Sequence, residues 1–208
     1  MDSIVLASRN RGKIREYEDL FLKTPFKLRG IGEFPDVPEV IEDGDSFEEN
    51  AFKKAHTISK YLNLPAISDD SGLVIPALGG APGLHSARFF GSEITDEERC
   101  KRILELMEGK KERHAFFVCV ICIAVPSGKA RFYKGRCDGE ITYELLGKEG
   151  FGYDPIFYYP PYKKTFAQMK MQEKNSVSHR ARAIQSLKED MGNLINWIRE
   201  NMVDNPPQ

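Results

Sequence analysis

The chain has 208 residues, of which 41% are hydrophobic and 29% charged, and its formal net charge is −1. This length fits a single domain over residues 1–208, with room for two lobes that share a core. A charge balance near zero and the lack of a dense Lys/Arg block disfavour nucleic-acid binding. No apolar run is long enough for a signal-peptide core or a membrane span, so we expect a cytoplasmic protein without membrane association.

The first part of the chain alternates short apolar runs with helical patterns. Ser46 to Glu49 has the spacing of a capping box and predicts a helix that stops before Pro65. The predicted elements are, in order, a strand over 4–7, a helix from Lys13, a strand over 26–31, an acidic loop over 34–45, that helix, and extended segments over 66–68 and 73–75. The Asp-Asp-Ser-Gly sequence at 69–72 reads as a turn between the last two.

The rest of the chain combines a long hairpin with further helices. Thr95 to Glu98 again has capping-box spacing and opens a helix through Met107. The other predicted elements are a Gly-rich loop over 79–83, a hairpin of 113–125 and 130–137, a Gly-rich segment over 147–154, an apolar stretch over 156–159, one long helix over 178–199, and a frayed tail over 203–208. Strands interleaved with helices predict a mixed α/β fold.

Cys119 and Cys122 form a CxxC pair, a spacing also found in zinc and redox sites. The pair lies in a β-rich apolar run, and residues three apart on a strand point to opposite faces. No second CxxC or close His pair completes a ligand set. We therefore interpret these two thiols, together with Cys100 and Cys137, as buried core residues.

Ser8-Arg-Asn-Arg-Gly-Lys13 lies between the first predicted strand and the first helix. Backbone N–H groups at a helix N-terminus, together with a lysine, form a natural anion site. The segment resembles a P-loop only loosely, because the leading Gly is absent and Ile14 stands where a hydroxyl would hold magnesium. It is either a phosphate cradle whose metal is held elsewhere or an ordinary polar turn.

Asp69 and Asp70 are adjacent carboxylates, and their mutual repulsion is costly unless a cation or strong donors compensate it. Mg²⁺ takes hard oxygen ligands and usually only one or two protein carboxylates. Further candidate ligands are Glu42, Asp43 and Asp45 in the acidic loop and Glu49 in the helix after it. The alternative is a solvated turn without a ligand.

Gly150-Phe-Gly-Tyr-Asp-Pro155 places two glycines around an aromatic residue. Such backbone can approach a planar ligand closely, and Phe151 or Tyr153 can stack on a base. The same pattern fits a tight turn with buried aromatic side chains.

The sequence before the last predicted helix contains two candidate N-caps, Ser176 and Ser178. Either places His179 and Arg180 in the first turn, where their donors can reach a ligand oxygen. The alternative for His179 is a solvent-exposed side chain without a ligand.

In combination, these segments resemble one family, the inosine triphosphate pyrophosphatases, also called Ham1-like proteins or XTP/dITP diphosphatases. The matching motifs are, in chain order, Ser8-Arg-Asn-Arg-Gly-Lys13, Ser46-Phe-Glu-Glu-Asn-Ala51, Ser68-Asp-Asp-Ser-Gly-Leu73, Gly79-Gly-Ala-Pro-Gly83, Ser86-Ala-Arg88, Gly150-Phe-Gly-Tyr-Asp-Pro155 and Ser178-His-Arg180. The resemblance implies an elongated, twisted mixed sheet flanked by helices, two lobes around a central substrate cleft, and a homodimer. It also implies Mg²⁺-dependent hydrolysis of ITP, dITP and XTP to the monophosphate and pyrophosphate.

The same resemblance implies roles for individual residues. Asp70 is the catalytic proton acceptor and a Mg²⁺ ligand together with Glu42, for which Glu39 and Asp43 are alternatives because the acidic loop varies in length. The implied substrate-binding residues are Ser8, Arg9, Asn10, Arg11, Gly12, Lys13 and Lys174 for the triphosphate, Ser71 beside Asp70, Phe151, Gly152, Tyr153 and Asp154 around the base, and His179 and Arg180 at the purine 6-oxo group.

Two other functions stay open on the sequence alone. A related pyrophosphatase with a different base preference would share the metal and phosphate groups but need other base contacts. A non-catalytic nucleotide sensor on the same scaffold would bind without turnover, and the presence of both Asp69 and Asp70 disfavours it.

Overall fold

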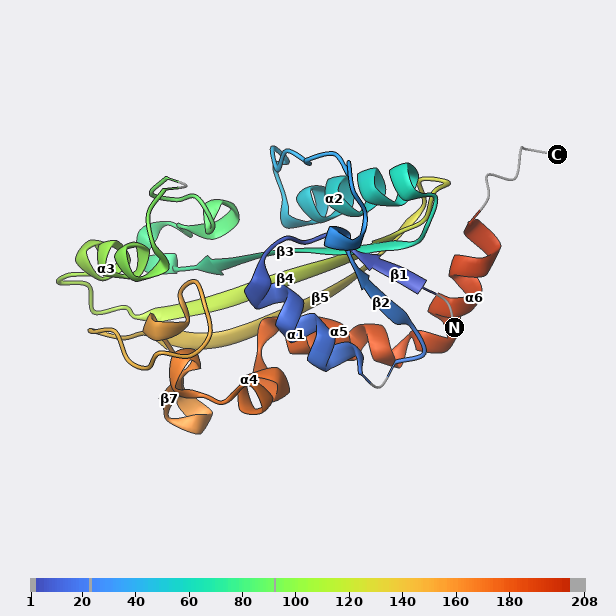
Figure 1. The fold of residues 1–208 in the computed structure, drawn as a ribbon. Coiled ribbons are helices and arrows are strands. Elements are labelled where there is room, and N and C mark those ends of the chain that lie inside the picture. The colour runs from blue at the N-terminus through green and yellow to red at the C-terminus, as the bar shows by residue number, and fades with distance from the viewer. Residues whose placement is uncertain (1–2, 23, 92, 203–208) are drawn as a thin grey trace. The chain divides into compact units, whose positions relative to one another are not determined.

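The computed structural model of the chain describes residues 3–22, 24–91 and 93–202. Figure 1 shows strands interleaved with helices. The strands are β1 (Ser3–Leu6), β2 (Lys27–Gly30), β3 (Ala66–Val74), β4 (His114–Ala124), β5 (Ala130–Ile141), β6 (Phe157–Tyr159) and β7 (Lys164–Thr165). The helices are α1 (Arg11–Phe21), α2 (Phe47–Leu62), α3 (Asp96–Leu106), α4 (Met171–Val177), α5 (His179–Glu189) and α6 (Met191–Asn201).

All seven strands hydrogen-bond into one sheet in the order β2-β1-β3-β4-β5-β6-β7. β1 runs parallel to β2 and β3, whereas β6 is antiparallel to both β5 and β7. This mixed sheet with its helices confirms the predicted α/β fold. Within the described residues, no helix is long and apolar enough to cross a membrane.

The contacts divide the chain into two compact units. The first contains residues 1–70, 119–135 and 183–208, and the second contains residues 71–118 and 136–182. β3, β4, β5 and α5 therefore each contribute residues to both units. The predicted two lobes around a central cleft concern the relative placement of these units and stay a prediction, as does the assignment of 1–208 to one domain.

Helices pack on both faces of the strands in the first unit, with α2 on one side and α1, α5 and α6 on the other (Figure 1). Successive side chains of a strand point to opposite faces. In β1, Ile4 and Leu6 accordingly join the core formed with α1, α5 and α6, whereas Val5 packs with Ile58 of α2. Burying each such aliphatic side chain contributes about 1.5–3 kcal/mol.

The second unit has a core of its own that includes α3, α4 and β6. At the start of β4, Ala115 and Phe117 are buried while His114, Phe116 and Val118 are partly exposed, which is the alternation of a strand with one covered face. Phe117 packs edge-on against Phe157 at a centroid distance of 4.7 Å and stacks on Phe166 at 5.9 Å.

Two predictions about local structure are wrong. Residues 69–72 are not a turn, because β3 runs without interruption from Ala66 to Val74. The predicted single helix over 178–199 is two helices, α5 and α6, separated at Asp190. The Asp190 carboxylate accepts hydrogen bonds from Arg131 and Tyr133 of β5, both at 2.7 Å, and these contacts fix the chain where the helix is interrupted.

Further differences concern the end of the chain. α4 precedes the last predicted helix and was not anticipated, and Ser178, with extended backbone at φ −65° and ψ 160°, separates it from α5. Ser178 is the cap of α5, since its Oγ accepts from the Ala181 N–H at 3.2 Å, whereas the Ser176 hydroxyl donates to the Glu173 carbonyl. The predicted tail over 203–208 lies outside the described residues.

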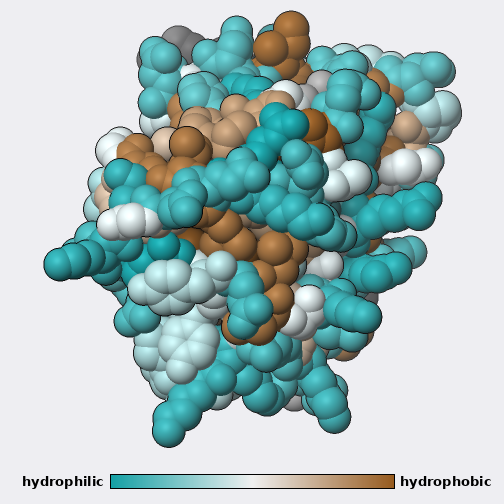
Figure 2. Space-filling view, turned by 90° about the vertical axis from the view of Figure 1, so that its left-hand side faces the viewer, coloured by the Kyte–Doolittle hydropathy of each residue, from teal (hydrophilic) through white to brown (hydrophobic). Residues whose placement is uncertain are grey.

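On the face shown in Figure 2, most residues are hydrophilic and apolar residues show between them. All four cysteines are buried thiols, as predicted. Cys119 belongs to the core formed with α1, α5 and α6, and Cys122 lies three residues further along the same strand, so the two thiols point to opposite faces.

We expect these thiols to be unreactive in the folded protein. Burial raises the pKa of Cys100 and of Cys122 to about 12 and that of Cys137 to about 11, so almost no thiolate forms at pH 8. Titration with Ellman's reagent should proceed at least about a hundredfold more slowly in buffer than in guanidinium chloride, where all four thiols react. A thiol that reacts in buffer at the rate of free cysteine would contradict the burial.

Candidate functional site

The predicted phosphate-binding segment, residues 8–13, follows β1 and runs into the first turn of α1. Asn10 is the N-cap of α1, and its Oδ1 accepts the Lys13 N–H at 3.0 Å. Ser8 Oγ accepts the Asn10 N–H at 3.3 Å, and Arg9 donates to the Val37 carbonyl at 3.4 Å. The first turn of α1 contains no acidic side chain. The helix N-terminus therefore presents backbone donors together with a lysine, as an anion site requires.

Lys13 lies beside the first carboxylate of β3. Its ammonium forms an ion pair with Asp69 Oδ2 at 3.1 Å and also donates to the Asp69 carbonyl at 3.3 Å. The Cys119 thiol donates to the same carboxylate oxygen at 3.7 Å. Asp69 is 2% exposed, so this pair brings the start of α1 against the middle of β3.

Asp70 is also buried but contacts a different helix. Its Oδ2 accepts a hydrogen bond from the Asn50 side chain at 3.1 Å, and its Oδ1 lies 3.8 Å from the Lys54 ammonium, both on α2. Lys54 forms a second and shorter ion pair with Glu42 Oε1 at 2.7 Å. Two carboxylates, Glu42 and Asp70, thus converge on one ammonium group.

Burial and nearby charges shift the pKa values of both Asp70 and Lys54. Burial raises the pKa of Asp70 above its ordinary value, against the attraction of the Lys54 and Lys13 charges. For Lys54, burial alone would lower the pKa, but the negative charges of Asp70, Glu42 and Asp69 outweigh it and raise the pKa. Lys54 therefore stays an ammonium group, while Asp70 is a stronger base than an ordinary aspartate.

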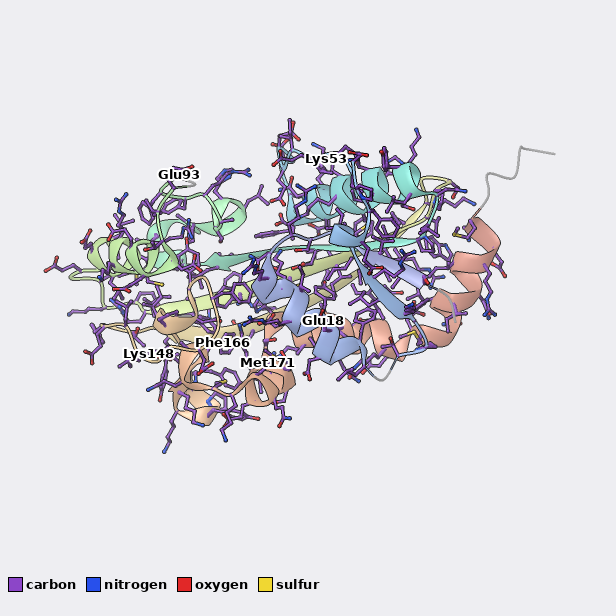
Figure 3. The ribbon with its side chains drawn as sticks, in the orientation of Figure 1. Glu18, Lys53, Glu93, Lys148, Phe166 and Met171 are labelled. Atoms are coloured by element: carbon purple, nitrogen blue, oxygen red, sulfur yellow. The ribbon has the colours of Figure 1, made fainter. Side chains whose placement is uncertain are left out.

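The acidic loop is attached to α2 by a series of contacts. Asp43 pairs with Lys53 at 3.0 Å, on the outward side of α2 (Figure 3), and the Gly44 N–H donates to Asn50 Oδ1 at 2.8 Å. The Asp45 N–H donates to the Glu49 carboxylate. In the predicted capping box this carboxylate would accept from Ser46, and here it accepts from the residue before it. Of the three candidate partners for Asp70, Glu42 shares the Lys54 ammonium with it, whereas Asp43 pairs with Lys53 and Glu39 is exposed.

The chemistry of this donor set is compatible with a divalent cation. Glu42 and Asp70 supply two carboxylates to one positively charged group, and Mg²⁺ typically binds one or two carboxylates, with water and phosphate oxygens completing its shell. Among the described residues, no group of three or more His, Cys, Asp or Glu side chains forms a cage for a metal ion. A hard cation that shares its ligands with a substrate fits these residues better than a structural metal.

In the second unit, the start of α5 contains the predicted base-reading residues. Arg180 is 1% exposed and donates to Ser71 Oγ at 3.2 Å. The His179 ring stacks on Phe117 of β4 with centroids 4.6 Å apart and planes 13° from parallel. His179 is 4% exposed, so it is not a solvent-facing side chain.

The glycine loop of the second unit is built around a buried ion pair. The Asp154 carboxylate accepts the Lys174 ammonium at 2.6 Å and the Phe151 N–H at 2.9 Å through the same oxygen. The Lys174 ammonium lies 4.7 Å from the Phe151 ring centroid, within the range of a cation–π contact. Tyr153 points into the core, where its hydroxyl donates to the Ser86 carbonyl at 2.8 Å.

The sequence model of the Ham1 family matches residues 4–190 of the chain. The chain belongs to the Ham1 family. It is 48% identical to a dITP/XTP pyrophosphatase of Desulfotalea psychrophila, over 98% of this chain and 92% of the relative. It is 45% identical to a dITP/XTP pyrophosphatase of Syntrophobacter fumaroxidans, over 97% and 87%. A solved structure of a HAM1 protein from Coxiella burnetii superposes with a TM-score of 0.85 at 42% identity, covering 93% of this chain and all of that one.

The fold of this Ham1-family protein thus brings the predicted residues into two clusters, one in each unit. The cluster of the first unit contains Lys13, Asp70 and Glu42, and that of the second contains Ser71, Lys174, His179 and Arg180 together with the glycine loop. Tyr153 and Asp154 are buried and bond within the protein, whereas the Phe151 side chain is partly exposed. Arg11 is exposed at the start of α1.

Lys54, Asn50 and Phe117 are the site residues that the sequence analysis missed. Lys54 and Asn50 contact Asp70, and Phe117 fixes the His179 ring. The signal for Asn50 and Lys54 was present, because they lie four residues apart and therefore share one face of α2 with the buried Ile58. No local pattern distinguishes Phe117 from other core aromatics.

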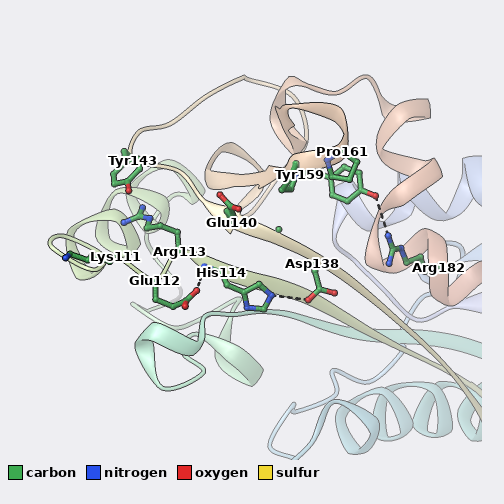
Figure 4. A pocket seen from close by; sticks show the side chains of 12 residues that line it. Lys111, Glu112, Arg113, His114, Asp138, Glu140, Tyr143, Tyr159, Pro161 and Arg182 are labelled. Carbon is green, nitrogen blue, oxygen red and sulfur yellow. Dashed lines mark hydrogen bonds and ion pairs between the residues drawn. The ribbon is translucent and has the colours of Figure 1, made fainter.

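The second unit also has a cavity of about 730 Å³ (Figure 4). Its wall includes His114, which pairs with Asp138 at 3.1 Å, and Arg182, which lies 3.5 Å from the Tyr159 hydroxyl. The Arg113 guanidinium donates to three backbone carbonyls and is therefore already hydrogen-bonded within the protein. None of the residues predicted for the site lines this cavity, and we do not assign the substrate to it.

The glycine loop allows a paired mutational test. Gly150 has φ +78°, and a Cβ there would overlap the Asp154 carboxylate, whereas Gly152 has φ +61° and open space around a Cβ. We expect Gly152→Ala to cost about 1 kcal/mol of the free energy of unfolding, from backbone strain alone. Gly150→Ala should cost at least about 2 kcal/mol, because it also displaces a buried ion pair. Equal losses in urea denaturation would show that the overlap with Asp154 is relieved at no cost.

Proposed function

We propose that this protein hydrolyses the triphosphates of deaminated purine nucleosides, ITP, dITP and XTP, to the nucleoside monophosphate and pyrophosphate. The name dITP/XTP pyrophosphatase of the Desulfotalea and Syntrophobacter relatives supports this assignment. The observation that carries the proposal is the buried Asp70 carboxylate, which accepts a hydrogen bond from Asn50 and lies beside the Lys54 ammonium group. Glu42 forms an ion pair with the same ammonium group. A buried base of this kind beside lysines suits attack on a phosphate chain.

The triphosphate chain belongs, in this proposal, to the first unit. It carries about four negative charges, and attack on phosphorus requires that they be neutralised. Ser8 through Lys13 offer the N-terminus of α1 and a lysine, and Lys54 adds a second ammonium group beside Asp70. The predicted triphosphate role of Lys174, which holds the glycine loop of the second unit through Asp154, stays a prediction.

We assign Mg²⁺ to Glu42 and Asp70, where it would neutralise phosphate oxygens and lower the pKa of a coordinated water. Asp70 accepts the proton of the attacking water. Asn50 keeps this carboxylate oriented, because its amide donates to one oxygen and leaves the other toward Lys54. Lys13 stabilises the departing pyrophosphate.

Selection of the base rests on hydrogen-bond polarity. Donors from His179 and Arg180 suit the 6-oxo oxygen of hypoxanthine and xanthine, whereas the 6-amino group of adenine would present a donor to a donor. Both side chains are buried and held, His179 by the Phe117 ring and Arg180 by Ser71, so an unpaired donor could not turn to water. GTP shares the 6-oxo oxygen, so its rejection must depend on the 2-amino group. A cytoplasmic location and a homodimer complete the proposal.

Replacing the proton acceptor tests the catalytic part of the proposal. Asp70→Asn keeps an oxygen for the Asn50 amide but removes the base, so we expect turnover of ITP to fall at least about a hundredfold. Pyrophosphate release with Mg²⁺ present measures the rate, and circular dichroism checks the fold. Asp43→Asn serves as the matched control, because it neutralises an exposed carboxylate that pairs with Lys53. Comparable turnover in Asp70→Asn would remove Asp70 from this role.

A substrate panel tests the base preference. We expect pyrophosphate release from ITP and XTP to exceed release from GTP and dTTP in kcat/KM. In His179→Ala the ratio of ITP to ATP should fall about tenfold, because one donor to the 6-oxo oxygen is lost. Preferential turnover of dTTP would favour a related pyrophosphatase with another base preference. Binding of ITP with Mg²⁺ but no pyrophosphate release would favour a nucleotide sensor.

A further inference from the structure

Gly152, at the centre of the glycine loop, is bound by α3 at both of its backbone polar groups. Its N–H donates to Asp96 Oδ2 at 2.7 Å, and its carbonyl accepts from the Cys100 thiol at 3.3 Å. Asp96 and Cys100 lie one helical turn apart, so they present their side chains on the same face of α3. Neither residue belongs to the motifs that carry the proposed function.

Asp96 is itself held in place by the first turns of α3. Thr95 caps the helix through the Glu98 N–H, which makes Asp96 the first helical residue. The other oxygen of the Asp96 carboxylate accepts from Arg99 at 2.7 Å. Arg99 is 6% exposed, so its guanidinium is a fixed partner that orients the carboxylate toward Gly152.

The loop amides on either side of the Phe151 side chain are therefore both bound by carboxylates. The Phe151 N–H donates to Asp154 and the Gly152 N–H donates to Asp96. Asp154 also binds Lys174, whose ammonium lies over the Phe151 ring. Hydrogen bonds from a backbone N–H to an ionised acceptor are stronger than neutral ones, so they limit the positions available to this short segment.

We propose that Asp96 is a positioning residue for nucleotide binding, which fixes the Gly150–Asp154 loop through Gly152 and thereby the place of the Phe151 ring. Asp96 touches the loop backbone and has no role in bond cleavage. This inference rests on the proposed function, because it supposes that the base of the bound nucleotide contacts the Phe151 ring. Cys100 supports the same loop from one turn further along α3.

The test compares Asp96→Ala with Glu97→Ala. Glu97 is the next residue of α3, is exposed and pairs with Lys101, so its loss removes the same charge from the same helical turn without contact to Gly152. Hydrogen–deuterium exchange of the peptide over residues 150–154 reports on loop order without any substrate. Steady-state hydrolysis of ITP with Mg²⁺ then separates KM from kcat.

We expect loop exchange to quicken in Asp96→Ala and to stay at the wild-type rate in Glu97→Ala. KM for ITP should rise about fivefold in Asp96→Ala, a modest change because the carboxylate is half-exposed. Its kcat should stay within about twofold, since the lost interaction orders the loop rather than stabilising the transition state. Unchanged exchange, or a fall in kcat without a rise in KM, would overturn the inference.

Asp96→Ala leaves the buried Arg99 without this carboxylate and can fail to fold for that reason. The double variant Asp96→Ala with Arg99→Leu removes both partners and is judged by the same exchange and kinetic criteria. If the wild-type protein released no pyrophosphate from ITP, the proposed function would fail. The exchange comparison would still decide whether Asp96 orders the loop.

Discussion

Two adjacent carboxylates in the middle of a central strand impose the main constraint on this molecule. Asp69 and Asp70 are both buried in β3. Because neighbouring side chains of a strand point to opposite faces, one cation cannot form a close ion pair with both carboxylates. Lys13 of α1 pairs with the first, and Lys54 of α2 approaches the second. The α/β layering is therefore also what makes the charged strand tolerable, since each face needs a helix that supplies a lysine.

The balance of these charges bears on what can bind. In the contacts of the first unit, three carboxylates, Glu42, Asp69 and Asp70, face two ammonium groups. A polyanion that approached alone would meet a cluster whose lysines are already paired and whose excess charge is negative. A triphosphate accompanied by a divalent cation would avoid this conflict, because the cation proposed at Glu42 and Asp70 would supply the missing positive charge. The electrostatics thus support the assignment of Mg²⁺ beyond the identity of its ligands.

The sequence predicted the features that are fixed by residues close together in the chain and missed those that depend on distant residues. The helix starts at Ser46 and Thr95 were predicted correctly, because each cap bonds to an N–H three residues away. The strand character of 69–72 was missed, because the partner of Asp69 is 56 residues distant and only its presence makes a buried aspartate acceptable. The interruption at Asp190 was missed for the same reason, since Arg131 holds it from another element.

The same distinction between local and distant causes holds for the candidate site. In α2, however, helical periodicity could have identified more of the site residues than the sequence analysis did. Lys53 and Lys54 are adjacent in sequence, yet one pairs with Asp43 on the outward side and the other approaches Asp70. A helix repeats its face about every four residues, so Lys54 shares a face with Asn50 while Lys53 does not. Asn50 and Lys54 contact different oxygens of Asp70, so one helical turn fixes the carboxylate at both ends. The spacing of an amide and an ammonium on one helix is therefore as much a part of the site as the Asp-Asp-Ser-Gly motif itself, although only the motif is conspicuous in the sequence.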